Sequence, residues 1–168
     1  MLRISGTAMR EPPSSIFLIK NLKVLCIHGY EGILSKRSPN AVGWELPVLS
    51  CSSSLVNQEL MDCNLRAISN DFQNLHLLEV LNLSENNFIC LPESIIRLFT
   101  LKDIFIENCT SLQSLPQFPL STKRIWANGC TSLETLPTQL KQGNCFEPTI
   151  YLLNCLKLVD NQGFSDKF

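Results

Sequence analysis

Residue types that often do chemistry are present in this chain, but their spacing builds neither a catalytic nor a metal site. The two histidines, His28 and His76, lie far apart. The serines have no positioned histidine and carboxylate to activate them. The eight cysteines include no Cys-x-x-Cys pair, which argues against zinc, and no Gly-x-x-x-x-Gly-Lys-[Ser/Thr] loop is present to hold phosphates. We therefore expect a protein that is not an enzyme and that uses no metal or cofactor.

Composition narrows the choice of partner. The chain has 168 residues, of which 45% are hydrophobic and 17% charged, so it can form one domain with a real core. Its net charge is −1 and it has no basic run, which argues against nucleic-acid binding through phosphate contacts. No apolar stretch approaches the roughly 18 residues that suggest a membrane span. A protein partner is what remains.

A recurring pattern of aliphatic residues organises the chain. Its clearest copy is Leu78-x-x-Leu81-x-Leu83-x-x-Asn86, and the next copy is Leu101-x-x-Ile104-x-Ile106-x-x-Cys109. Equivalent positions are 23 residues apart (104 − 81). A period between 20 and 29 residues, with Asn or Cys after the third apolar residue, is typical of a leucine-rich repeat. The position of Leu81 recurs at Leu2, Leu25, Gln58, Leu81, Ile104, Ile125 and Ile150.

The spacing within each copy predicts strands rather than helices. Apolar residues at i, i+3 and i+5 do not follow the helical spacing, whereas Leu81-x-Leu83 alternates as a strand does. Prolines soon afterwards, such as Pro92, disfavour a long helix. We therefore predict an α/β fold, a leucine-rich-repeat solenoid with a parallel β-sheet on its concave face and an irregular or short helical convex side. The Asn or Cys side chain should lie inside the turn and bond to neighbouring backbone groups.

The pattern also predicts the domain boundaries. Residues 1–158 form one repeat domain of about seven repeats, and residues 159–168 form a polar C-terminal tail. One interval is about ten residues longer than the others, and residues 31–54, rich in Ser, Pro and Gly, are expected to be an irregular loop inserted there. Gln58, Thr122 and Ala127 depart from the apolar rule, which makes the third and sixth repeats degenerate.

Alternation along each strand predicts the exposed residues of the concave face. If Leu81 and Leu83 point inward, then Val80, Asn82 and Ser84 point outward. The central outward residue of each repeat should then line up with those of its neighbours. This row consists of Cys26, Glu59, Asn82, Phe105, Trp126 and Tyr151.

The last three members of this row predict a protein-binding patch. Three adjacent aromatic side chains on a solvent-facing sheet, flanked by charges, are typical of a binding hot spot. The predicted site comprises Phe105, Trp126, Tyr151, Asp103, Glu107, Arg124 and Asn82. Two alternatives remain open: a further module covers these rings, or the strand register shifts in the degenerate sixth repeat.

Half of the eight cysteines occupy one position of the repeat. Cys63, Cys109, Cys130 and Cys155 fall on the same repeat position as Asn86. Neighbouring turns need not bring their sulfur atoms into bridging geometry, and residues 1–21 lack the apolar region and cleavage site of a secretory signal. We therefore expect reduced thiols and a cytoplasmic protein.

Several phrases resemble the repeat region of plant intracellular immune receptors. They are Cys63-Asn64-Leu65, Leu81-Asn82-Leu83-Ser84-Glu85-Asn86-Asn87-Phe88, Leu91-Pro92-Glu93-Ser94-Ile95, Cys109-Thr110-Ser111-Leu112-Gln113-Ser114-Leu115-Pro116 and Asn154-Cys155-Leu156-Lys157-Leu158. The most similar class is the Toll/interleukin-receptor, nucleotide-binding, leucine-rich-repeat disease-resistance proteins. The resemblance covers nearly the whole chain and implies a cytoplasmic or nuclear location.

The same resemblance implies a function. In this family the repeats recognise pathogen effectors and help to hold the receptor inactive. The family's phosphate loop and Toll-like module are absent, so we expect a fragment that keeps the recognition surface without the signalling parts. The partner would be a pathogen effector, a host protein or another domain of the receptor. The alternative is a free-standing scaffold or decoy that binds host proteins without immune signalling.

Overall fold

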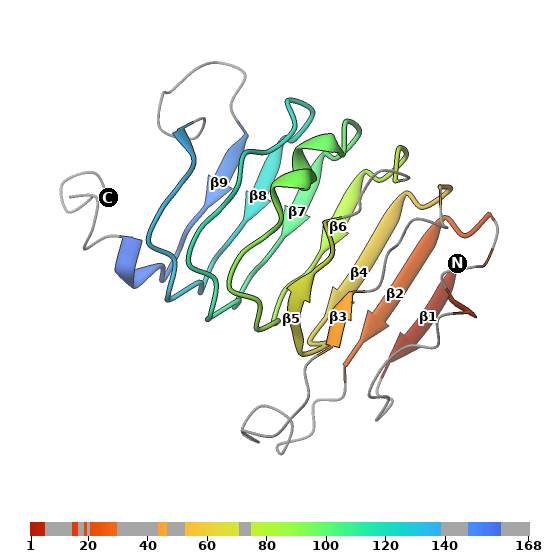
Figure 1. The fold of residues 1–168 in the computed structure, drawn as a ribbon, viewed down its shortest axis with the longest axis horizontal. Helices are drawn as coiled ribbons and strands as arrows, with labels where there is room; N and C mark the ends of the chain where they lie inside the picture. The colour runs from red at the N-terminus through yellow and green to blue at the C-terminus, as the bar shows by residue number, and fades with distance from the viewer. Residues whose placement is uncertain are drawn as a thin grey trace.

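The structure, a computed structural model, describes residues 1–5, 15–16, 19, 21–29, 44–46, 53–70, 75–138 and 148–158. The predicted tail and most of the predicted insertion therefore lie outside the described residues. Within them, parallel strands follow one another side by side along a solenoid (Figure 1). The predicted fold class, a leucine-rich-repeat solenoid, is confirmed.

A seven-stranded parallel sheet forms one wall of the solenoid. Its strands, in spatial order, are β1 (Leu2–Ser5), β2 (Val24–His28), β4 (Asn57–Met61), β6 (Val80–Asn82), β7 (Asp103–Phe105), β8 (Arg124–Trp126) and β9 (Thr149–Tyr151). The residues paired across it include Leu2, Leu25, Gln58, Leu81, Ile104, Ile125 and Ile150, one from each strand. These are the predicted repeat positions, so the register predicted for each repeat, the degenerate sixth included, is confirmed.

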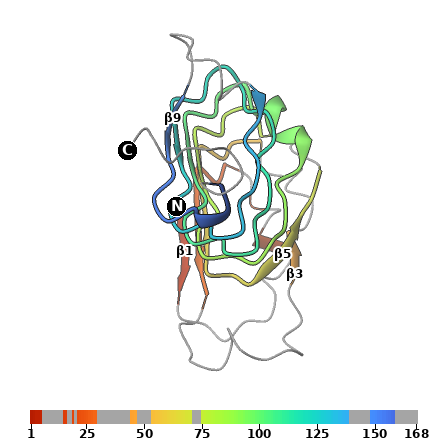
Figure 2. The same ribbon diagram turned by 90° about the vertical axis from the view of Figure 1, so that its left-hand side faces the viewer.

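The opposite wall is mostly irregular. It includes a short 3-10 helix, η2 (Glu93–Arg97), which follows Pro92 and buries Ile95 completely. It also includes a second, two-stranded parallel sheet made of β3 (Trp44–Leu46) and β5 (Leu65–Ile68). Figure 2 shows the solenoid end-on, with β1 and β9 in one wall and β3 and β5 in the other. β3 lies within residues 31–54, so that stretch is not irregular throughout, because its backbone pairs with the strand that follows β4.

Aliphatic side chains from every repeat fill the space between the walls. Leu81, Leu83, Ile104, Ile106 and Ile125 are all fully buried. They belong to one continuous cluster that runs through the described repeats. A single repeat has no partner for this apolar face, so stacking of repeats supplies the core.

Gln58 is the exception in this core. It occupies the position of Leu81 in its repeat, is fully buried, and has no hydrogen-bond partner for either side-chain polar atom among the described residues. An unpaired buried amide costs free energy. The third repeat is therefore a weak point of the solenoid.

The turns that follow β4, β6, β7, β8 and β9 are each held by an Asn or Cys side chain, as predicted. The Asn86 Nδ2 atom donates to the carbonyl oxygen of Leu60 in the preceding repeat at 2.7 Å. Its Oδ1 atom accepts from the backbone N–H groups of Cys63 and Leu65 at 3.1 and 2.9 Å. The buried Asn86 side chain therefore links its own turn to the turn of the preceding repeat, both as a donor and as an acceptor of hydrogen bonds.

The four cysteines at the same repeat position as Asn86 make an equivalent donor hydrogen bond with their thiols. Each thiol donates to a backbone carbonyl of the preceding repeat, at 3.1 to 3.4 Å. The pairs are Cys63 with Ile27, Cys109 with Leu83, Cys130 with Ile106 and Cys155 with Ala127. Burial raises the pKa of Cys63, Cys109 and Cys130 to about 12 in each case, which keeps the donor proton in place.

The residue just before each Asn or Cys adopts an unusual backbone conformation. It has positive φ in five successive repeats, at Asp62 (53°), Glu85 (61°), Asn108 (56°), Gly129 (74°) and Asn154 (61°). Only glycine, and to a lesser degree asparagine, takes this conformation at low cost. At Gly129 a Cβ atom would also lie 2.3 Å from Asn108 Oδ1, so any other residue there would have to displace the Asn108 side chain.

Replacing Asn86 tests the turn. We expect Asn86→Ala to lower the free energy of unfolding by about 3–5 kcal/mol, because two backbone N–H groups and three backbone carbonyls lose their hydrogen bonds to this side chain. Asn86→Cys should lose less, because a thiol can still donate to the Leu60 carbonyl. Urea unfolding of the three chains measures this order. Equal stability of Asn86→Ala and the wild type would contradict it.

The buried thiols predict a fall in stability at alkaline pH. The pKa of Cys109 is about 12 in the folded chain and the ordinary value is 9.0, so above pH 9 the unfolded chain loses its proton first. Stability is therefore complete below pH 9 and is lost between pH 9 and 12, by up to about 1.4 kcal/mol per pH unit for each thiol. In urea unfolding at pH 8 to 11, Cys109→Ala should show a shallower decline. Cys90→Ala, at an exposed cysteine, is the control and should leave the slope unchanged.

Candidate recognition surface

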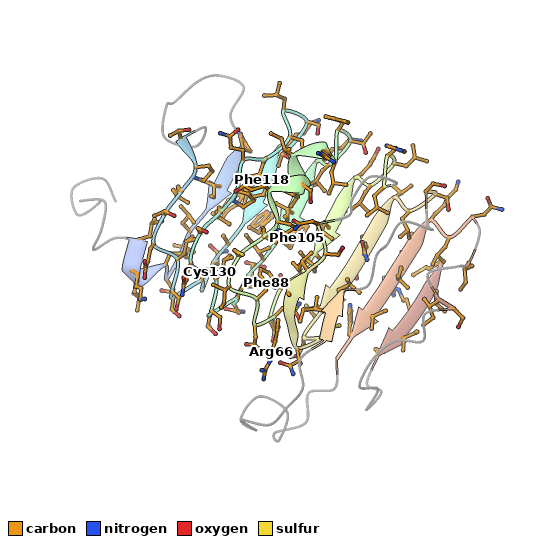
Figure 3. The ribbon with its side chains drawn as sticks, in the orientation of Figure 1. Arg66, Phe88, Phe105, Phe118 and Cys130 are labelled. Atoms are coloured by element: carbon orange, nitrogen blue, oxygen red, sulfur yellow. The ribbon has the colours of Figure 1, made fainter. Side chains whose placement is uncertain are left out.

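The candidate site lies on the face of the seven-stranded sheet that points away from the core, which we call the outer face. The pairs Asn82–Phe105, Phe105–Trp126 and Trp126–Tyr151 are in register across β6, β7, β8 and β9. The predicted row of central residues is therefore confirmed. Figure 3 labels Phe105 in this part of the sheet. Whether these residues bind a partner remains a prediction.

Phe105, Trp126 and Tyr151 form a stack, which we call the aromatic ladder. The ring centroids of Trp126 and Tyr151 are 3.8 Å apart with an interplanar angle of 9°. Those of Phe105 and Trp126 are 5.9 Å apart at 6°. Each such contact contributes about 0.5–1.5 kcal/mol beyond burial. All three side chains are only partly buried, so the ladder still offers apolar surface to a partner.

The indole N–H of Trp126 has no acceptor. Its Nε1 atom is buried and lacks a hydrogen-bond partner within the part of the chain that the structure describes. A buried tryptophan N–H normally finds a partner. Ring stacking therefore holds this side chain in place at the expense of one hydrogen bond.

Asp103 and Arg124 pair with each other beside the ladder. Arg124 Nε donates to Asp103 Oδ1 at 2.5 Å, and Nη2 donates to Oδ2 at 2.8 Å. The hydrogen bond from Arg124 lowers the pKa of the Asp103 carboxyl. Asp103 is largely buried under this contact, with a side-chain exposure of 12%, whereas that of Arg124 is 54%. The prediction that Asp103, Glu107 and Arg124 flank the rings as exposed charges is therefore wrong for Asp103, because the guanidinium of Arg124 covers its carboxylate.

Glu107, the third charge predicted to flank the rings, forms hydrogen bonds only with uncharged groups among the described residues. Its Oε1 atom accepts from Asn128 Nδ2 at 2.8 Å, and Asn128 Oδ1 in turn accepts from the Leu153 N–H at 2.9 Å. The Glu107 N–H donates to Ser84 Oγ at 3.1 Å. Ser84 is therefore buried, at 5% exposure, although strand alternation predicted an outward side chain.

The amino-terminal half of the outer face is polar. Glu59 Oε2 lies 3.4 Å from His28 Nε2, and Glu59 Oε1 accepts from Asn57 Nδ2 at 3.2 Å. Cys26 belongs to the same row but is buried, at 2% exposure, so alternation misplaced it as well. Its pKa is raised by burial and by its contact with Glu59. Among the described residues, no group of His, Cys, Asp or Glu is arranged to hold a metal ion.

Glu59 is the residue of this surface that the predicted site omits. The Glu59–Asn82 and Asn82–Phe105 pairs place it two strands away from Phe105 in the same row. Its position was predictable from the alternation rule, but its relevance was not, because the site was built around the aromatic residues alone. The signal in the sequence that could have pointed to Glu59 is that it is the one charged residue in a row otherwise made of Cys26, Asn82, Phe105, Trp126 and Tyr151.

Comparison with known proteins finds that the chain is similar to parts of two plant resistance proteins. The chain is 32% identical over 117 residues to the TMV resistance protein N of Nicotiana glutinosa, a match that covers 68% of this chain and 10% of the relative. It is 31% identical over 115 residues to a protein of Arabidopsis thaliana that is named as a disease resistance protein, again over 68% of this chain and 9% of the relative. No family model matches.

The chain is a repeat region like those of plant nucleotide-binding, leucine-rich-repeat resistance proteins. This confirms the resemblance to plant resistance proteins. The chain corresponds to about a tenth of the length of each of these relatives. In the part that the structure describes, no helix has the length and apolar character needed to cross a membrane.

The Asp103–Arg124 pair of this repeat region predicts a response to acid. The pKa of Asp103 is lowered in the folded chain, so below its ordinary value of 3.8 the unfolded chain takes up the proton first. The stabilisation is therefore present above pH 3.8 and is lost as the pH falls further. Asp103→Asn should be less stable at pH 7 and should lose less on acidification, as followed by thermal unfolding from pH 6 to 2.5. Glu134→Gln, at an exposed ion pair with Lys157, is the control. If Asp103→Asn and the wild type lost stability equally between pH 6 and pH 2.5, the Asp103–Arg124 pair would not be the source of the acid sensitivity.

Proposed function

We propose that this chain is the protein-recognition module of a plant intracellular immune receptor of the Toll/interleukin-receptor, nucleotide-binding, leucine-rich-repeat class. Its partner is a pathogen effector, a host protein or another domain of the receptor. It acts by binding in the cytoplasm or nucleus, and it is not an enzyme. The similarity to two resistance proteins supports the immune role.

The aromatic ladder is the observation that carries the binding role. Three partly exposed rings in contact occupy the outer face of a rigid sheet, next to the fixed charges of Arg124 and Glu107. Aromatic anchors with polar surroundings are typical of the centre of a protein–protein interface. Because the sheet holds the rings in place, little side-chain freedom remains to be lost on binding.

A comparison of two substitutions tests this role. Trp126→Ala should weaken partner binding at least tenfold, because a central aromatic anchor is removed. It should cost only about 1–3 kcal/mol of stability, from the two lost stacking contacts. Leu83→Ala should cost about 2–5 kcal/mol as a buried truncation but leave the affinity of the folded chain unchanged.

Proximity labelling in plant cells identifies the partner, and titration with the purified partner measures its affinity. Phe99→Ala is the matched control, because Phe99 is 74% exposed and follows η2, outside the sheet. Partner binding that survives Trp126→Ala but is lost in Phe99→Ala would place the interface elsewhere. Partners confined to host proteins with no part in defence would favour the free-standing scaffold.

A further inference from the structure

One position on the outer face combines an aromatic face with two carboxylates that form no ion pair with a lysine or arginine among the described residues. Asn82 lies between Glu59 and Phe105 in the row that crosses β4, β6 and β7. Neighbouring strands are about 4.8 Å apart, so the backbones of Glu59 and Phe105 are separated by roughly 9–10 Å. Asn82 is the short member between two larger side chains.

Asn82 is also held close to its own strand. Its Oδ1 atom accepts a hydrogen bond from the Ser84 N–H at 3.0 Å. This bond keeps the side chain low and directed along the strand. The ring of Phe105 stacks on Trp126 on one side, and within the described residues it has no ring contact on the side of Asn82. One face of Phe105 is thus directed toward a position that no large side chain fills.

The charge around this position is negative. Among the described residues, neither Glu59 nor Glu107 is paired with a lysine or arginine. The guanidinium of Arg124 is already engaged by Asp103. The contacts of Glu59 come from Asn57, Cys26 and His28, of which only His28 can carry a positive charge. Arg3 lies one strand further along the sheet and contacts the Cys26 thiol. Glu59, across Asn82 from Phe105, and Glu107, two residues after Phe105 in the chain, therefore leave a surplus of negative charge near Phe105.

We propose that this position binds the guanidinium group of an arginine on the protein partner, an inference that rests on the recognition function proposed above. The planar guanidinium stacks on the free face of Phe105. Its N–H groups donate to the carboxylate of Glu59 or Glu107 in charge-assisted hydrogen bonds. The three groups meet three needs of an arginine: a planar contact, a counter-charge and acceptors.

Other occupants fit less well. A lysine supplies charge but no plane to stack on Phe105. A purely apolar segment would bury Glu59 and Glu107 without compensation, which costs free energy. An acidic segment or a nucleic acid would place like charges together. The position therefore adds specificity to the affinity that the aromatic ladder supplies.

Peptide selection tests the arginine. A library of random twelve-residue peptides displayed on phage is panned against the full chain, and a selected peptide is then titrated by calorimetry. We expect the selected peptides to share an arginine next to an apolar residue. Replacing that arginine with citrulline, a neutral analogue of the same shape, should weaken binding roughly tenfold or more. Lysine should restore only part of the loss.

Variants of the chain locate the contact. Glu59→Gln and Glu107→Gln should weaken the arginine peptide, at least one of them by roughly tenfold, and should affect the citrulline peptide little. Phe105→Leu, which keeps an apolar side chain but removes the ring, should also weaken it. Glu79→Gln is the matched control, because Glu79 is paired with Lys102 outside this position.

The outcomes separate the two proposals. Selected peptides that depend on Trp126 but contain no shared arginine, or that bind both Gln variants like the wild type, overturn the arginine inference and leave the recognition surface standing. Peptides that bind equally well to Trp126→Ala overturn the recognition surface itself.

Discussion

The buried turn that follows each of the strands β4, β6, β7, β8 and β9 is the interaction on which the rest of the structure depends. At this point Asn86 or a cysteine donates to a carbonyl of the preceding repeat, where no water can replace it. The positive φ of the residue before it directs the chain into the turn. Because every such bond connects one repeat to the one before it, the turns fix both the distance and the register between neighbouring repeats. The hydrophobic core supplies most of the free energy, and its aliphatic positions favour the same register that the turns hold.

A fixed register has a direct consequence for function. In a parallel sheet whose strands pair without shifts, side chains at equivalent repeat positions form straight rows. Phe105, Trp126 and Tyr151 stack because they share one such row, and their rings need no other support. The surface can therefore vary from repeat to repeat while the core and the turns stay constant. This separation explains how a repeat protein can present a specific surface on a generic scaffold.

The sequence was sufficient for the seven strands of the main sheet and for the rows of side chains that cross it. Leu81, Ile104 and Ile125 lie side by side as their spacing predicted, and the ladder followed from alternation alone. Side-chain partners were not predictable in the same way. Asp103 and Ser84 are buried because Arg124 and the Glu107 N–H contact them, and these contacts come from neighbouring repeats. Alternation describes the direction of a side chain, whereas burial depends on what the adjacent strand places beside it. The strand β3 was missed for a related reason, since its pairing with β5 has no periodic signal.

The charges of the outer face differ in what they can do for recognition. Asp103 and Arg124 satisfy each other, so a partner that contacts them must either break a bidentate pair or accept it as a neutral surface. Glu107 is oriented by Asn128, which restricts its geometry but leaves its charge unbalanced. Glu59 lies 3.4 Å from the partly exposed His28 and, among the described residues, forms no ion pair with a lysine or arginine. Burial of either glutamate under a partner without a cation would carry an uncompensated desolvation cost. The aromatic ladder can therefore favour many apolar partners, but these two carboxylates penalise every partner that does not bring a positive charge to them.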